Sequence, residues 1–314
     1  MNLPLPRIRR VLDHARHRID TQVDTGSGWR APGESDRAAG LVVPDSAFTT
    51  DHEIARYDAL GLADGVEVLP VCPVSFRDFM LFEQHAVNAA RGMARRFVPA
   101  GYRLGRVYET LTRRTFPPFR PHALWYREPI YYMSNAQTIV PSGLPITAPP
   151  YSRALDFELE LGVVLGAPLR DATPEQAAAA IAAAVVINDF SARDVQLAEM
   201  RSGFGPQRAK HFITSMSVTA VAGPGLAARL GDVRGTVAVN GKVLSRTGTQ
   251  TMRYTLAEAI AHVSRGEQLY PGELFSSGTL PGGCGMELGR WLAPGDDLRL
   301  ELEGIGVIEH RIQE

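Results

Sequence analysis

Four acidic residues are placed so that their carboxylates could bind one metal ion. Glu158 and Glu160 lie two residues apart, and on a β-strand this spacing points both side chains to one face. Asp189 follows an apolar stretch typical of a buried strand, and Asp78 stands among phenylalanines. Adjacent carboxylates repel each other unless a cation or solvent intervenes. An all-oxygen ligand set favours Mg²⁺, with Ca²⁺ or Mn²⁺ as alternatives, over zinc or copper.

A simpler interpretation of two glutamates on one strand face is a face exposed to water. Asp189 also has a simpler interpretation as a helix cap, although Ser191 is better placed for that role. The opposite face of the glutamate stretch is apolar, as expected of a strand that covers a core, and consists of Leu155, Phe157, Leu159 and Leu161. The two further acids favour a metal site over a solvated face.

The amino-acid composition argues against several classes of protein, namely nucleic-acid-binding, disulfide-rich and membrane proteins. The 33 Lys+Arg and 34 Asp+Glu residues nearly balance, so no basic field attracts nucleic acid. Two cysteines are too few for a disulfide framework and indicate a reducing compartment. The N-terminus lacks the apolar core of a signal peptide. The longest apolar run, from Ala177 to Ile187, covers 11 residues, whereas a membrane span needs about 20. We therefore expect a cytoplasmic protein without nucleic-acid or membrane partners.

The elements that must position these acids divide into two parts. An N-terminal amphipathic helix is predicted from apolar residues at helical spacing, namely Ile8, Val11, Leu12, Ala15 and Ile19. Residues 24–40 are rich in Gly, Ser and charge and indicate a loop. The composition shifts near residues 69–73, which predicts an N-terminal segment over residues 1–72 and a catalytic domain over residues 73–314.

The larger part has mainly β signals with a few capped helices. Capping boxes predict helices that begin after Thr173 and Thr255, and Ser191 is expected to cap a third. Asn240-Gly241 between two apolar segments predicts a tight hairpin. Strands without regular βαβ alternation favour a β-rich α+β fold. Neither a dinucleotide-binding glycine motif nor the nucleophile elbow of serine hydrolases is present in the sequence.

Four motifs in a fixed order carry a family resemblance. They are DFELELG at 156–162, INDFSARDVQ at 187–196, SGTLPGG at 277–283 and LAPGDDLRLELEGIG at 292–306. With them, from about Asp78 to the C-terminus, the chain resembles the fumarylacetoacetate hydrolase superfamily, whose members are metal-dependent enzymes that act on β-diketo and 2-oxo acids. The resemblance implies a mixed β-sandwich and β-roll catalytic domain preceded by a short N-terminal domain.

The resemblance also implies roles for particular residues. The metal ligands would be the four acids already singled out, Asp78, Glu158, Glu160 and Asp189. His85 matches the catalytic histidine of the fumarylacetoacetate hydrolase type, and Glu287 matches the glutamate that orients it. Arg193, Gln196 and Lys210 match residues that polarise the substrate, whereas Tyr132 and Thr279 match substrate-binding positions. Without the motif, His85 would be interpreted as a structural histidine. Cys284 lacks a partner that would make it a nucleophile and is predicted to be a packing residue.

The chain departs from that type at the far end of the substrate site. Met80 occupies a substrate-binding position where a tyrosine is expected, and Ala94 stands where an arginine would bind a distal carboxylate. Arg91 and Arg95 are near enough in sequence to replace the missing arginine. The two departures predict a substrate that is less acidic or more apolar at one end.

Three functions remain open on the sequence. The first is hydrolysis of a carbon–carbon bond in an acylpyruvate or related β-diketone, with His85 as the general base and Lys210 as a proton donor. The second is decarboxylation or tautomerisation of a 2-oxo acid such as oxaloacetate. The third is a non-catalytic metal-binding or ligand-binding module. For each we expect a small diketo or oxo acid as the partner, and a homodimer.

Overall fold

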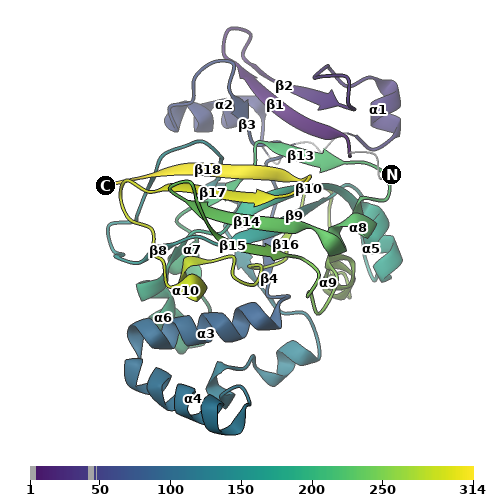
Figure 1. The fold of residues 1–314 in the computed structure, drawn as a ribbon. Coiled ribbons are helices and arrows are strands. Elements are labelled where there is room, and N and C mark those ends of the chain that lie inside the picture. The colour runs from purple at the N-terminus through teal and green to yellow at the C-terminus, as the bar shows by residue number, and fades with distance from the viewer. Residues whose placement is uncertain (1–4, 42–45, 47) are drawn as a thin grey trace.

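The computed structural model of the protein describes residues 5–41, 46 and 48–314. Residues 1–4, 42–45 and 47 of the predicted N-terminal segment lie outside the described residues. Figure 1 shows strands layered through the middle of the molecule, with an N-terminal hairpin at one end and helices α3 and α4 projecting at the other. The strand-rich α+β class predicted from the sequence is confirmed.

The main sheet has eleven strands, and Asp78 and Glu160 lie in two of them. Its central path runs through β2 (Arg18–Asp24), β1 (Arg7–Asp13), β13 (Thr219–Ala222), β10 (Ile181–Asn188), β9 (Leu159–Leu165), β16 (Leu274–Ser276), β4 (Phe76–Phe79) and β5 (Tyr131–Ser134). Three further strands join it at the side, namely β3 (Glu67–Val68), β6 (Ile139–Pro141) and β12 (Thr214–Met216).

A second sheet of five strands packs against the first. Its order is β15 (Lys242–Gly248), β14 (Arg234–Val239), β17 (Asp297–Leu302), β18 (Gly306–Gln313) and β7 (Ile146–Thr147). A separate pair joins β8 (Leu155–Asp156) to β11 (Ser191–Ala192). Strands β17 and β18 lie over β9 and β10, and Figure 1 shows these yellow strands crossing the centre of the molecule.

The main core lies between the two sheets because alternate residues of β9 and β10 point to opposite faces. Leu161 and Val186 belong to the cluster shared with Leu300 of β17. Their neighbours Val164 and Ile187 belong to a second cluster on the other face. Both faces of these strands are therefore buried, which explains their nearly continuous apolar sequence.

The helices lie around the sheets and at their edges. They are α1 (Glu34–Ala38), α2 (Thr50–Ala59), α3 (Glu83–Phe97), α4 (Pro99–Thr112), α5 (Pro174–Ala180), α6 (Arg193–Ser202), α7 (Gln207–Lys210), α8 (Leu226–Arg229), α9 (Leu256–Val263) and α10 (Gly285–Leu288). In the part of the chain that the structure describes, none of them is both long enough and apolar enough to cross a bilayer.

Most of the helix caps and turns predicted for residues 73–314 are confirmed. Thr173 caps α5 and Thr255 caps α9, each with a complete capping box. Asn240 and Gly241 join β14 to β15 with positive φ angles of 53° and 72°, as a type I′ turn requires. Ser191 does not cap α6, however, because it lies in β11 and its hydroxyl donates to the Asp189 carbonyl oxygen. The helix begins without a side-chain cap.

The predicted N-terminal helix is wrong. Residues Arg7–Asp13 and Arg18–Asp24 form an antiparallel hairpin, and β1 also pairs with β13 of the main sheet. Ile8 and Leu12 are buried, but their spacing suits a strand as well as a helix. Arg10 lies between them on the same strand face, where it pairs with the buried Glu53 at 2.8 Å. Because Arg10 is charged but points inward, the residues of β1 do not alternate regularly between apolar and polar, and the sequence pattern did not indicate a strand.

The N-terminal segment contains one further correction. The stretch predicted as a loop over residues 24–40 includes the short helix α1, whose Asp36 accepts two hydrogen bonds from Arg30 at 2.5 and 2.8 Å. Because β1 pairs with β13, the N-terminal hairpin extends the main sheet. The domain boundary after residue 72 stays a prediction.

Candidate active site

The main sheet brings the four predicted metal ligands to one edge. Asp78 lies in β4 beside Ser276 of β16, and Glu160 lies in β9 opposite Ile187 of β10. Glu158 immediately precedes β9 and Asp189 immediately follows β10. Because β9 and β10 are antiparallel, the start of one strand meets the end of the other. All four carboxylates are buried, with at most 4% of each residue exposed.

Three of these acids form a group that could hold a cation. Ligand oxygens of Asp78, Glu160 and Asp189 all lie within 4.8 Å of one another. Burial raises the pKa of Asp78 and of Glu160 well above the usual range, and repulsion between the carboxylates raises both further. Asp78 Oδ1 is buried and has no hydrogen-bond partner. A hard divalent cation would satisfy this oxygen and reduce the repulsion, so these residues fit a metal ion.

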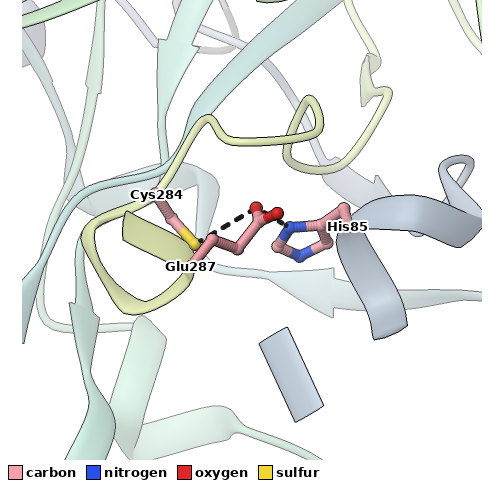
Figure 2. A group of neighbouring side chains, drawn as sticks. All are labelled: His85, Cys284 and Glu287. Carbon is pink, nitrogen blue, oxygen red and sulfur yellow. Dashed lines mark hydrogen bonds and ion pairs between the residues drawn. The ribbon is translucent and has the colours of Figure 1, made fainter. Parts of the chain in front are cut away.

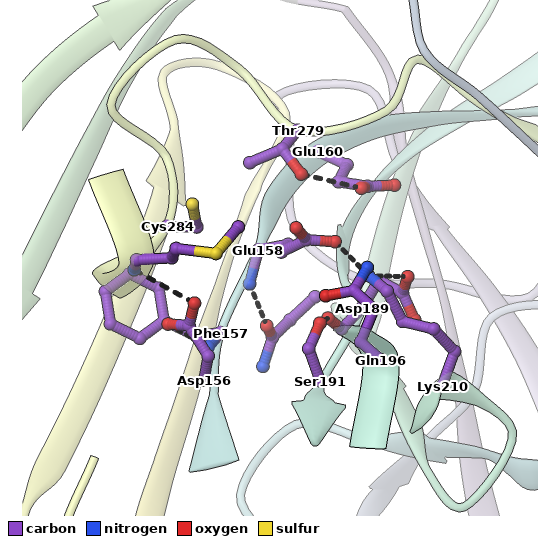
Figure 3. A network of polar contacts seen from close by, with 12 residues as sticks. Asp156, Phe157, Glu158, Glu160, Asp189, Ser191, Gln196, Lys210, Thr279 and Cys284 are labelled. Carbon is purple, nitrogen blue, oxygen red and sulfur yellow. Dashed lines mark hydrogen bonds and ion pairs between the residues drawn. The ribbon is translucent and has the colours of Figure 1, made fainter. Parts of the chain in front are cut away.

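Glu158 lies on the cationic side of the site rather than in this group of three. Its Oε1 accepts from Arg193 at 2.7 Å and its Oε2 accepts from Lys210. Lys210 also donates to Asp189 at 2.6 Å and so bridges two predicted ligands. Figure 3 shows this bridge, with Lys210 reaching between the two acids. Burial alone would raise the pKa of Glu158, but the two cations outweigh burial and hold it below its usual range.

Asp156 has a positioning role that the sequence analysis missed. It is fully buried, accepts from Arg193 Nε at 2.8 Å and also accepts from the backbone N–H groups of Gly285 and Met286 at 2.8 and 3.0 Å. It therefore ties Arg193 to the helix that carries Glu287. The signal was present, because Asp156 continues the two-residue spacing of Glu158 and Glu160.

His85 and Glu287 form a hydrogen-bonded pair from distant parts of the chain. His85 lies in the first turn of α3 and Glu287 lies in α10, with 2.7 Å between Nδ1 and Oε1 (Figure 2). Glu287 also accepts from the Gly282 N–H at 3.0 Å. A carboxylate partner at Nδ1 assigns the ring proton to that nitrogen and leaves Nε2 as the hydrogen-bond acceptor. His85 lines the same cavity as the carboxylates.

Cys284 lies behind this pair. Its thiol donates to Glu287 Oε1 at 3.5 Å and is fully buried. Burial and the adjacent carboxylate raise its pKa well above the usual range, so the sulfur keeps its proton at neutral pH. A protonated thiol is a poor nucleophile, which supports the interpretation of Cys284 as a packing residue.

The predicted substrate-binding residues also line the cavity, whose volume is about 530 Å³. The Tyr132 hydroxyl donates to Asp189 at 2.7 Å, and the Thr279 hydroxyl donates to Glu160 at 3.4 Å. Gln196 Oε1 accepts from Arg193 Nη1 at 2.9 Å, which directs the amide NH₂ of Gln196 away from Arg193. Met80 contributes to the wall.

Neither candidate for the missing distal arginine reaches the cavity. Arg91 donates to Glu109 at 2.7 and 3.1 Å, and Arg95 donates to the Met286 carbonyl oxygen at 3.4 Å. Ala94, like these two arginines, is absent from the cavity wall. The departure from the family pattern is therefore not compensated by either neighbouring arginine.

Parts of this chain are similar to known proteins. A family model described as the C-terminal part of fumarylacetoacetate (FAA) hydrolase matches residues 107–313. A mitochondrial oxaloacetate tautomerase of Bos taurus is 32% identical over 192 residues, which are 59% of this chain and 59% of that protein. The matched region thus spans less than two thirds of that relative.

Two solved structures show the same fold. A fumarylacetoacetate hydrolase from Exiguobacterium antarcticum has a TM-score of 0.65 and 20% identity, with 98% of this chain and 99% of that chain covered. A 2-hydroxyhepta-2,4-diene-1,7-dioate isomerase from Mycobacterium marinum has a TM-score of 0.61 and 19% identity, with 98% of both chains covered. Hydrolases, isomerases and tautomerases are therefore all among the similar proteins.

Proposed function

Since the chain belongs to the fumarylacetoacetate hydrolase family, we propose that it is a metal-dependent hydrolase of acylpyruvates or related β-diketo acids. The observation that supports this activity best is the His85–Glu287 pair, because His85 lines the same cavity as Asp78 and Glu160 while Glu287 holds its ring. A base next to a metal site is the combination that attack of water on a carbonyl requires.

Asp78, Glu160 and Asp189 would hold the metal ion, with Glu158 as the fourth acid beside them. The all-oxygen ligand set favours Mg²⁺, with Ca²⁺ and Mn²⁺ as the alternatives. When bound, such a cation supplies Lewis-acid polarisation of two substrate oxygens that chelate it.

His85 is placed to act as the general base. With the Nδ1 proton donated to Glu287, Nε2 is free to take a proton from a water molecule that attacks the distal carbonyl carbon. Glu287 is itself held by the Gly282 N–H, so the ring has a fixed orientation. Base assistance of this kind typically contributes roughly 10²- to 10⁴-fold in rate.

Three donors are available for the oxyanion that forms at the attacked carbonyl. Arg193, Gln196 and Lys210 line the cavity, and the Gln196 amide has its NH₂ free because Arg193 occupies its oxygen. Their positions are fixed in advance by Asp156, Glu158 and Asp189. Donors that need no rearrangement stabilise developing charge most effectively.

Collapse of the tetrahedral intermediate breaks the carbon–carbon bond between the attacked carbonyl and the adjacent methylene carbon. The electron pair stays on the methylene carbon as a pyruvate enolate, and the other fragment leaves as a carboxylic acid. We assign Lys210 to return a proton to that carbon, because its ammonium group lies at the end of the cavity that carries the acidic side chains, where it donates to Glu158 and Asp189. Solvent takes up the proton that His85 removed from water and returns a proton to Lys210, which restores both groups.

A second candidate function is tautomerisation or decarboxylation of a 2-oxo acid such as oxaloacetate. The relative from Bos taurus, whose name states oxaloacetate tautomerase, favours it. A tautomerase moves one proton between carbon and oxygen and breaks no carbon–carbon bond. Product analysis therefore separates a tautomerase from a hydrolase, because only the hydrolase releases two fragments.

The test is a screen of acylpyruvates with protein that has been stripped of metal and resupplied with Mg²⁺, Mn²⁺ or Ca²⁺. Loss of the enol absorbance reports any consumption, and nuclear magnetic resonance of the products distinguishes cleavage from tautomerisation. We expect metal-dependent formation of pyruvate and the matching carboxylic acid. Metal-dependent conversion of oxaloacetate without cleavage of any diketo acid would favour the second candidate.

The variant His85→Ala separates the mechanisms further. It should abolish hydrolysis, whereas a decarboxylase that relies on the metal alone would keep most of its activity. Glu158→Ala addresses the third hypothesis, a non-catalytic binding module, for which only ligand binding or stability could change. Any metal-dependent turnover by the wild-type protein would eliminate that hypothesis.

A further inference from the structure

We propose that the end of the cavity remote from the carboxylates is an apolar subsite, which binds an uncharged acyl or aryl group of the substrate. This inference rests on the proposed function only for the identity of the reacting half, a 2,4-dioxo acid. It adds that the distal group carries no carboxylate. Two helices and one aromatic segment form this end of the cavity.

Helix α3 changes from polar to apolar along the face that lines the cavity. After His85, the lining residues of this helix are Ala86, Ala89, Ala90 and Met93. They fall at the spacing of one helical face. With a rise of 1.5 Å per residue, the apolar lining extends roughly 12 Å along the helix beyond His85.

Helix α6 repeats this change on another wall. Arg193 and Gln196 line the polar end, and Leu197 and Met200 follow on the same helix. Arg193 is buried and bound to Glu158, whereas Met200 is 51% exposed at the mouth of the cavity. The distance along the axis from Arg193 to Met200 is roughly 10 Å. Both helices therefore place their apolar residues on the side away from the acids.

The segment after α4 closes this end with aromatic rings. Trp125 is fully buried, and its indole N–H donates to the Met80 carbonyl oxygen, so the polar atom of the ring is already satisfied. Phe119 is 5% exposed and lines the same wall. Met80 and Met286 add two flexible side chains that can adapt to groups of different shape.

Among the described residues, the buried part of the distal wall offers no cation to a substrate carboxylate. Arg193 and Lys210 line the acidic end, whereas Arg120 and His122 belong to the distal aromatic segment and are exposed to solvent. A carboxylate placed between the alanines of α3 and Leu197 would lose its hydration without gaining a partner. Burial of an unpaired charge is strongly unfavourable, whereas each buried methylene would raise kcat/KM by up to roughly fourfold.

The decisive comparison uses two 2,4-dioxo acids of equal chain length, one with a terminal methyl group and one with a terminal carboxylate. We expect the Mg²⁺-supplemented full-length protein to favour the methyl-terminated acid at least tenfold in kcat/KM, and benzoylpyruvate to be better than acetylpyruvate. Equal or better use of the carboxylate-terminated acid would overturn the subsite.

A pair of methionine variants tests the location of the subsite. Met200→Arg places a cation at the apolar end and should reduce the preference for the methyl-terminated acid at least tenfold. Met133→Arg is the matched control, because Met133 is similarly exposed, at 47%, but does not line the cavity. Identical substrate preferences in the two variants would show that the distal group does not bind beside Met200.

Calorimetric binding to the His85→Ala protein separates this inference from the proposed function. If no diketo acid is cleaved by the wild type but the methyl-terminated acid binds at least tenfold more tightly, the hydrolase proposal fails and the subsite stands. If cleavage occurs but the carboxylate-terminated acid binds as tightly, the subsite fails and the hydrolase proposal stands.

Discussion

Gly92 of helix α3 lies directly against the backbone of Met286 in helix α10. A β-carbon added to Gly92 would overlap the Met286 carbonyl oxygen. Since His85 lies on α3 and Glu287 follows Met286, this glycine sets the distance between the helices that carry the His85–Glu287 pair. The pair therefore depends on a residue that has no side chain and takes no part in the chemistry.

Substitution of Gly92 should consequently damage activity without removing any catalytic group. In Gly92→Ala, we expect α3 to shift away from α10, which lengthens the contact between His85 and Glu287 and lowers kcat at least tenfold. The matched control is Gly101→Ala in α4, whose nearest contact is a Val98 side-chain carbon at 3.3 Å. That substitution should leave kcat unchanged, because it requires only a small shift of the Val98 side chain and α4 carries neither His85 nor Glu287. Equal kcat values for both variants would contradict the role assigned to Gly92.

The interaction between His85 and Glu287 makes a separate prediction for the glutamate. Glu287→Gln preserves the size of the side chain but offers an amide that can favour the wrong ring tautomer of His85. We expect kcat to fall by roughly 10²- to 10⁴-fold with little change in KM. Steady-state kinetics on the best acylpyruvate measure both constants. The control is His52→Ala on α2, an exposed histidine outside the cavity, which should retain wild-type kinetics.

Metal binding by the acidic group predicts a change in stability that does not depend on turnover. At a Mg²⁺ concentration one hundred times its dissociation constant, the free energy of unfolding should rise by about 3 kcal/mol. Glu160→Gln should lose most of this rise. Its metal-free form should be more stable than the metal-free wild type, because one source of repulsion is gone. Urea unfolding with and without Mg²⁺ measures both effects.

The control for metal binding is Glu303→Gln, which changes a carboxylate that is 60% exposed and pairs with Arg234 on the surface. It should respond to Mg²⁺ like the wild type. If Glu160→Gln gained as much stability from Mg²⁺ as this control, Glu160 would not be a ligand.

His310 predicts how stability depends on pH. Burial lowers its pKa to about 4, and its ring contacts the Leu144 carbonyl oxygen at 2.7 Å. Between pH 6.5 and 4, the unfolded chain takes up a proton at this histidine and the folded chain does not. The contribution of His310 to stability is therefore complete above pH 6.5 and is lost as the pH falls toward 4, by about 3 kcal/mol in total.

The measurement is urea unfolding of the wild type and of His310→Gln at several pH values between 7.5 and 4. The variant should lose less stability than the wild type over this range, because glutamine does not titrate. His52→Gln, an exposed control, should follow the wild type. Parallel curves for His310→Gln and the wild type would show that another group governs the acid sensitivity.

Much of the site was predictable because its residues repeat a local pattern. The alternation around Glu158 and Glu160 fixes their common face, and the apolar strand before Asp189 fixes its place at a sheet end. The motif match identified His85 and Glu287, which lie far apart in the sequence. No local pattern could have brought these two together, because their contact depends on the packing of α3 against α10.

Other features also depend on contacts between distant parts of the chain, and for this reason the sequence could not predict them. Arg10 interrupts the apolar face of β1, and only the buried Glu53 explains how an arginine is accommodated there. Ser191 has the sequence of a helix cap, but pairing of β11 with β8 takes its backbone into a strand. The partners of Arg91 and Arg95 likewise come from α4 and α10, so the sequence could not show that neither arginine reaches the cavity.

The change from polar to apolar lining along α3 and α6 has a consequence for how this protein could diversify. His85 and Arg193 occupy the first turns of the two helices, and the apolar residues that line the cavity lie one or two turns later on the same rigid elements. Replacement of Ala90 or Met200 would alter which acids are accepted while His85 and Arg193 keep their places. On the proposed subsite, new substrate ranges would be accessible through single substitutions that leave the reacting groups untouched.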